Sequence, residues 1–129
     1  MLRINKFIEI LKREGFRTEI IKKNFAKIYL DRTLSNNDLM SLYLFCNENK
    51  AELFDEDMMT EVFIYGLEDM PIENLLCHEV ICDRKKGLVE ISVDEENFLE
   101  SLEKLAISVE KIDKMIERKR EEKIHGRTN

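Results

Sequence analysis

The 129-residue sequence contains no tryptophan, one proline and four glycines. So little proline and glycine excludes collagen-like chains and low-complexity disordered chains. No apolar run approaches the roughly 20 residues that a membrane-spanning helix needs. The N-terminal stretch MLRINKFIEILKREG mixes charged and apolar residues, so it lacks the unbroken apolar segment of a signal peptide. We therefore expect no membrane association and a cytoplasmic location.

Cysteine and histidine are also scarce, and their spacing fits neither a disulfide framework nor a zinc site. Each of the three cysteines, Cys46, Cys77 and Cys82, lies in an apolar stretch, which favours buried free thiols in a reducing compartment. His78 follows Cys77 directly, but zinc sites use two close-spaced ligand pairs, and adjacent side chains project apart. We therefore expect no metal site and no catalytic residue. His125 lies in a polar tail that we expect to be disordered.

Phosphate-binding and nucleophile motifs are absent from the sequence as well. The glycines stand alone at positions 15, 66, 87 and 126, so they cannot form a phosphate-binding loop. No serine combines with a histidine and an orienting acid at the spacing of a nucleophile elbow. The sequence therefore does not predict enzymatic activity, and it implies no cofactor.

What the chain holds in quantity is charge, with 21 basic and 27 acidic residues and a net charge of −6. Residues 1–34 carry nine basic and four acidic residues (+5), residues 35–110 carry five and nineteen (−14), and residues 111–129 carry seven and four (+3). An acidic middle argues against direct nucleic-acid binding. It favours a protein partner with a basic surface, a partner that itself binds nucleic acid, or self-association of unlike patches. A solvated surface that only maintains solubility is the plainer alternative.

The order of hydrophobic patterns predicts a single α+β domain over residues 1–129, with an antiparallel sheet of about four to five strands covered by helices. The expected elements are a helix over 4–15 that ends at Gly15, a strand within 16–32 whose first part is a hairpin arm, a strand over 39–46 covered on both faces, a short strand over 51–54, a helix over 58–69, a short helix from Pro71, a hairpin over 79–93 and a long C-terminal helix.

The C-terminal helix has the strongest periodicity in the chain, with apolar residues at alternating four- and three-residue steps. We expect about two dozen residues, capped by Asp94 or Ser92, followed by a basic, frayed tail over 118–129. Such a helix either lies across its own sheet or extends to a second copy, which makes its stripe a core or dimer seam. The seam residues are Phe98, Leu102, Leu105, Val109, Ile112 and Ile116.

Three consecutive acids, Asp55, Glu56 and Asp57, end the strand of 51–54 and precede a helix. Consecutive side chains diverge in a strand or a helix, so these carboxylates cannot converge on one ion without a dedicated loop. A helix start, in contrast, needs side-chain acceptors and negative charge, so we expect the acids to cap the helix. They also belong to an acidic surface that we expect to contact a partner, formed by Glu52, Asp55, Glu56, Asp57, Glu61, Glu68 and Asp69.

Two resemblances accompany these patterns. The passages LYLFCNENKAELFDEDMMTEVF and GLVEISVDEENFLESLEKLAISVEKIDKM resemble the bacterial and phage domain-of-unknown-function family 1828, over about residues 25–116. That resemblance implies a strand pair, an acidic turn, a helix, a hairpin and a closing helix, and no catalytic residues. Asp57 stands where the family's turn has glycine. The order of elements is also similar to the dimeric chaperones of type III secretion, which implies a module that holds an extended segment of another protein.

We therefore expect a non-enzymatic, homodimeric protein-binding module, such as an adaptor, a chaperone or a phage-type inhibitor of a host system. Two alternatives stay open. One is a small-molecule or nucleotide binder with a pocket between the sheet and the C-terminal helix. The other is a small hydrolase or metalloenzyme that uses Cys77, His78 or the acidic triplet.

Overall fold

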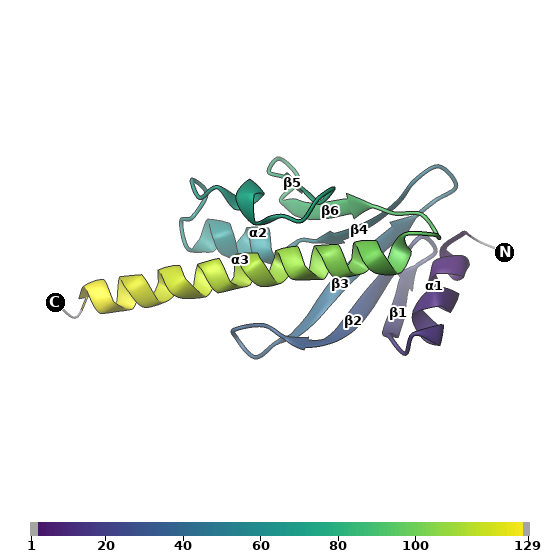
Figure 1. Ribbon diagram of the computed structural model, residues 1–129, viewed down its shortest axis with the longest axis horizontal. Coiled ribbons are helices and arrows are strands. Elements are labelled where there is room, and N and C mark those ends of the chain that lie inside the picture. Colours follow the sequence, from purple (N-terminus) through teal and green to yellow (C-terminus); the bar gives the residue numbers. More distant parts are fainter. Residues whose placement is uncertain (1–2, 128–129) are drawn as a thin grey trace.

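The computed structural model describes residues 3–127, and within them it confirms the α+β class (Figure 1). The sheet has six strands rather than four to five, because the hairpin arm and a three-residue strand near position 82 both join it. In chain order the elements are α1 (Arg3–Arg13), β1 (Arg17–Lys22), β2 (Phe25–Thr33), β3 (Leu39–Cys46), β4 (Ala51–Asp55), α2 (Asp57–Ile64), the 3-10 helix η1 (Ile72–Leu75), β5 (Ile81–Asp83), β6 (Leu88–Ser92) and α3 (Phe98–Arg127).

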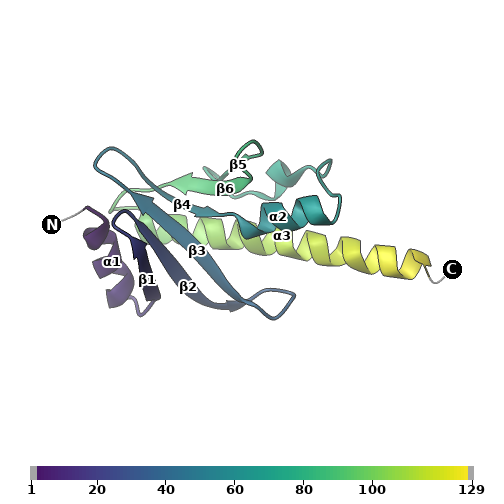
Figure 2. The same cartoon turned by 180° about the vertical axis from the view of Figure 1, so that it is seen from behind.

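All neighbouring strands are antiparallel, in the order β1-β2-β3-β4-β6-β5. Alternation along each strand therefore gives the sheet two distinct faces. The inner face, which the helices cover, carries Ile28, Leu42, Leu53 and Ile91, and all four are buried in one continuous core. Figure 2 shows the opposite, outer face, over which none of the described helices lies.

The prediction that β3 is covered on both faces is wrong. Its inner residues are buried, whereas Ser41, Tyr43 and Phe45 on the outer face are only half-buried. The outer aromatic rings shield one another instead of packing under a second layer. The ring centroid of Tyr43 lies 5.4 Å from that of Phe25 and 5.4 Å from that of Phe54. Aromatic residues therefore made this strand look more buried in the sequence than it is.

The predictions of the first helix, the middle helix, the short helix at Pro71 and the hairpin are confirmed with shifted bounds. Gly15 has φ of +84° and ends α1. The apolar stripe of α1 is buried against the sheet. The middle helix is shorter than the expected 58–69, because Gly66 at φ +67° stops α2 after Ile64. Pro71 precedes a single 3-10 turn, and the hairpin of β5 and β6 turns at Gly87, with φ of +71°.

Helix α3 runs along the inner face of the sheet and extends past it (Figure 1). Its 30 residues exceed the expected two dozen, because the helix continues through most of the segment 118–129 that was expected to be a tail. Neither expected cap binds its first turn directly: Asp94 accepts a bond from the Asn97 amide, and Asn97 accepts one from the Asp94 amide, just ahead of the helix. No helix within residues 3–127 combines the length and apolar character that a membrane span requires. All six seam residues are buried within the chain: Phe98, Leu102, Leu105, Val109, Ile112 and Ile116.

The seam therefore serves the core, which was one of the two roles expected for it. A second copy could reach these side chains only if α3 left the sheet, so a dimer contact through the seam is incompatible with this fold. Two ion pairs beside the seam join α3 to the sheet. Arg32, near the end of β2, donates to Glu103 (2.6 Å) and to Glu110 (2.7 Å) of α3.

Phe98 is fully buried, and its ring centroid lies 4.8 Å from that of Phe7, so it joins α3 to α1. We expect Phe98→Ala to lower the free energy of unfolding by about 3–5 kcal/mol, because it removes a buried ring and leaves a cavity. Urea denaturation followed by circular dichroism measures this. Phe63→Ala, at a half-exposed position on α2, is the control and should cost less than half as much. Equal losses would contradict the assignment of Phe98 to the core.

Candidate functional site: an acidic cleft beside α2

The sheet has a notch beside the first half of β3. Tyr43 and Phe54 form the last pair between β3 and β4, after which the chain leaves the sheet and enters α2. Residues 39–42 of β3 consequently have β2 on one side and no strand on the other. This difference in strand length opens a cleft of about 590 Å³ between β3, the β2–β3 turn and α2.

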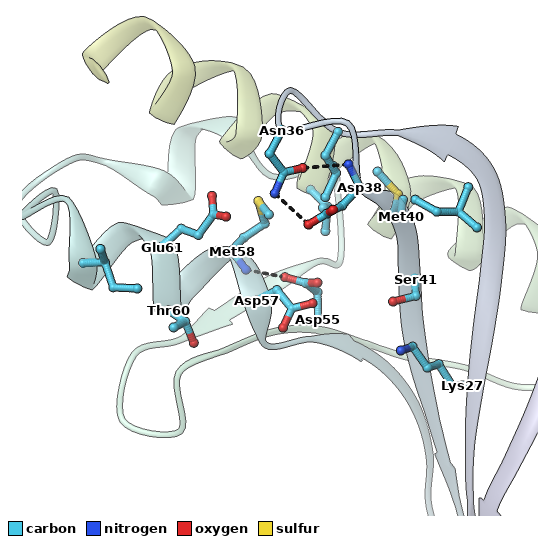
Figure 3. A pocket seen from close by; sticks show the side chains of 14 residues that line it. Lys27, Asn36, Asp38, Met40, Ser41, Asp55, Asp57, Met58, Thr60 and Glu61 are labelled. Carbon is cyan, nitrogen blue, oxygen red and sulfur yellow. Dashed lines mark hydrogen bonds between the residues drawn. The ribbon is translucent and has the colours of Figure 1, made fainter. Parts of the chain in front are cut away.

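Figure 3 shows the side chains that line this cleft, with α2 on one side and β2 and β3 on the other. We call it the acidic cleft, because four carboxyl groups line it, those of Asp38, Asp55, Asp57 and Glu61. Lys27 is the one basic residue in the lining, and its ammonium lies 5.2 Å from the Tyr29 ring centroid. The rest of the lining includes two hydroxyls and exposed apolar groups.

The β2–β3 turn forms one wall and is held in place by α3. Asp113 is buried, and its carboxylate accepts bonds from the Ser35 amide (2.9 Å) and the Ser35 hydroxyl (2.8 Å). Within the turn, Asn36 accepts a bond from the Asp38 amide and donates to the Asp38 carboxylate. Asn36 therefore holds the Asp38 carboxylate, within a turn that Asp113 of α3 fixes through Ser35.

Asp55 occupies the floor of the cleft, where β4 ends on the inner face. Its carboxylate accepts a bond from the Met58 amide (3.0 Å), so the predicted capping of α2 is confirmed for this residue. Only 3% of Asp55 is exposed. Burial raises the pKa of the Asp55 carboxyl to about 7, with smaller contributions from the Asp57 and Glu56 carboxylates, while backbone amides oppose the shift.

Glu61 faces the same cleft from the second turn of α2. Burial raises the pKa of its carboxyl, and the carboxylates of Asp113, Asp57 and Asp38 act in the same direction, whereas Arg120 opposes them. Two of the four carboxyl groups are thus harder to ionise than in water. Carboxylates that repel one another in a partly dry cleft favour a cationic occupant, since its charge would relieve the repulsion.

The other residues of the expected acidic surface do not line this cleft. Glu52 lies on the outer face of the sheet, where Lys50 pairs with it at 3.3 Å. Glu56 is exposed beside the cleft. Glu68 and Asp69 are exposed beyond the far end of α2. The expected surface is therefore split into three parts, and the buried Asp55 contributes little of its charge to solvent.

Cys46 is buried and free, Cys77 and Cys82 are half-buried and free, and His78 is exposed. The Cys77 amide donates to Ser108, so the segment's role in the fold is to join η1 to α3. Among the described residues, no group of three His, Cys, Asp or Glu side chains could hold a metal ion. The side chain of His125 lies outside those described.

The sequence did not single out Asp38, Lys27 or Asp113 as parts of this site. Asp38 lies in a turn cluster, SNND, that reads only as a chain reversal, and Asp113 lies on a helix face of ordinary charged residues. Their placement depends on the length of β4 and on how α3 crosses the sheet, and no local sequence pattern predicts that length or that crossing.

Searches of protein-family models, curated proteins and solved structures returned no match to this chain. The resemblances to the domain-of-unknown-function family 1828 and to the secretion chaperones stay predictions.

The raised pKa of Asp55 predicts a pH dependence of stability. The folded state binds this proton more tightly than the unfolded state, so stability falls as pH rises through the window from about 4 to about 7. Asp55→Asn keeps an acceptor for the Met58 amide and removes the buried charge. We expect its free energy of unfolding, relative to the parent protein, to rise by about 2–4 kcal/mol between pH 4 and pH 8.

Urea denaturation at a series of pH values measures this difference. Asp69→Asn, at an exposed position, controls for the loss of one surface charge. If the difference between Asp55→Asn and the parent protein were the same at every pH, the burial of an ionisable Asp55 would be contradicted.

Proposed function

We propose that the protein is a non-enzymatic binding module that engages a basic segment of another protein through the acidic cleft. The observation that carries this proposal is the convergence of Asp38, Asp57 and Glu61, from a turn and a helix, on one cleft. These groups, with one lysine in the lining, give a solvent-accessible opening an excess of acidic over basic side chains. A basic partner would be attracted and oriented by this field.

Apolar side chains at the rim support a lysine or arginine side chain as the occupant. Ile64 is 70% exposed and lines the cleft together with Leu39, which is 45% exposed. Long basic side chains pack their methylene stems on apolar surface while the charged head reaches a carboxylate. The cleft offers both surfaces within one opening, which a surface kept acidic only for solubility would not require.

A binding role fits the adaptor, chaperone or inhibitor classes that the sequence predicts. Holding a basic segment demands a rigid receptor, and both walls of the cleft are tied down by the Asp55 cap and the Asp113 bonds to the turn. Free thiols are typical of a reducing compartment, which supports the proposal of a cytoplasmic protein.

A second candidate function is binding of a small cationic molecule. The volume of about 590 Å³ lies in the range of small-molecule sites, and the lining joins β3 and α2 to Val109 of α3. This location is close to the pocket expected between the sheet and the C-terminal helix. The carboxylates disfavour nucleotide phosphates, so a polyamine or another organic cation is the better ligand class. Such a ligand would raise the melting temperature of the protein.

Replacing the three accessible carboxylates tests the binding proposal. We expect Asp38→Asn/Asp57→Asn/Glu61→Gln to weaken binding to arginine- and lysine-containing peptides by about tenfold or more and to reduce its salt dependence. The measurement uses a peptide array with varied number and spacing of basic residues, followed by fluorescence anisotropy of the best peptides at low and high salt.

A matched control removes three negative charges elsewhere, in the variant Glu14→Gln/Glu48→Gln/Glu96→Gln at exposed positions. It should bind the peptides nearly as the parent protein does. Equal weakening by both triple variants would reduce the effect to net charge, and an array without any preference for basic peptides would reject the proposal.

A further inference from the structure

The sheet has two edges, and only β1 presents a strand of useful length at its edge. In the strand order β5 is the other edge, but it has three residues and is followed by Arg84, which pairs with Glu73 at 2.8 Å. β1 has six residues and pairs only with β2 among the described strands. An unpaired strand edge exposes backbone donors and acceptors that can bind another strand.

Apolar residues on β1 are exposed to an unusual degree. Ile20 is 60% exposed and Ile21 is 43% exposed, although Ala26, the partner of Ile20 in β2, is fully buried. A cavity of about 620 Å³ beside Ile21 extends over Phe25 and Phe45. Exposed isoleucines on an edge strand are a liability in a monomer, and they are expected where a second strand adds to the sheet.

The charges of β1 complement a second copy of the same strand. On the outer face Arg17 and Glu19 are two residues apart, both held against Tyr29: the Arg17 guanidinium lies 4.1 Å from the ring centroid, and Glu19 accepts a bond from the Tyr29 hydroxyl at 2.8 Å. Two antiparallel copies centred on Thr18 would put each Arg17 opposite the other copy's Glu19. Phe16 would then face Ile20 on the inner side.

Other registers are worse. A pairing centred on Arg17 or on Glu19 puts like charges opposite each other across the two-fold axis. A pairing centred on Ile20 runs across the bulge between Ile20 and Lys22, where the strand is irregular. The register centred on Thr18 stays ahead of the bulge and pairs Arg17 with Glu19 on both sides of the axis.

We propose that two copies of this chain associate through antiparallel pairing of β1 with β1, centred on Thr18, to form a continuous twelve-stranded sheet. The contact lies apart from the acidic cleft, so it does not depend on the proposed function. A pair of short strands buries less area than the roughly 1,600 Å² of a standard interface. The dimer is therefore in equilibrium with the monomer and depends on protein concentration.

Charge exchange within β1 tests the register in solution. Arg17→Glu puts two pairs of glutamates in contact across the axis, and Glu19→Arg puts two pairs of arginines there. Each single variant should raise the dimer dissociation constant by about tenfold or more, and the double variant Arg17→Glu/Glu19→Arg should restore it. Sedimentation velocity over a roughly hundredfold range of concentration measures the constant, with Lys85→Glu as the charge control at an exposed turn.

Cysteine crosslinking gives a second readout that a folding defect cannot mimic. Thr18→Cys lies on the two-fold axis, where the two sulfurs are within reach of each other, so it should form an interchain disulfide under mild oxidation. Ile20→Cys should not, and the parent protein controls for its own three thiols. The proposal is overturned if the parent protein is monomeric at every concentration, if the charge exchange does not restore the dimer, or if Ile20→Cys crosslinks in preference to Thr18→Cys.

Discussion

The apolar stripe of α3 packs along the inner face of β4 and β6, with α1 on one side and α2 on the other. Most other features depend on this contact. It buries the seam, which is therefore not available to a second copy. It also brings α3 within hydrogen-bond distance of three other elements: Arg32 joins it to β2, Asp113 to the β2–β3 turn, and Ser108 to the segment after η1. Because α3 packs against α2 and its Asp113 binds the β2–β3 turn, this helix supports both of those walls of the acidic cleft.

The described helices cover only the inner face of the sheet, so the side chains of the outer face are shielded only by one another. Rings on neighbouring strands cover one another in the row of Phe25, Tyr43 and Phe54, and Lys27 lies near two tyrosine rings. The apolar sequence of β3 therefore does not require a second layer. The edge at β1 has no such protection, which is why its isoleucines stand out in the structure.

Asp55 shows how a local requirement becomes a site. The start of α2 needs a side-chain acceptor, and a carboxylate supplies it. Because β4 ends on the inner face, the same residue is drawn out of water, and its pKa rises. The carboxyl group of Asp55 is buried where the sheet has its notch, so the residue that caps α2 also forms the floor of the cleft.

The sequence by itself determined the α+β class, the helix stop at Gly15, the hairpin of β5 and β6, the stripe of α3 and the cap at Asp55. Each depends on neighbours within a few residues, through hydrophobic period, backbone freedom or local hydrogen bonding. Only the tertiary structure decided that the stripe is core rather than dimer contact, that β3 has one open face, and that Asp38 meets Glu61 across a cleft. Those outcomes depend on where the strands end and on which surfaces α3 covers. Contacts between residues far apart in the chain determine both.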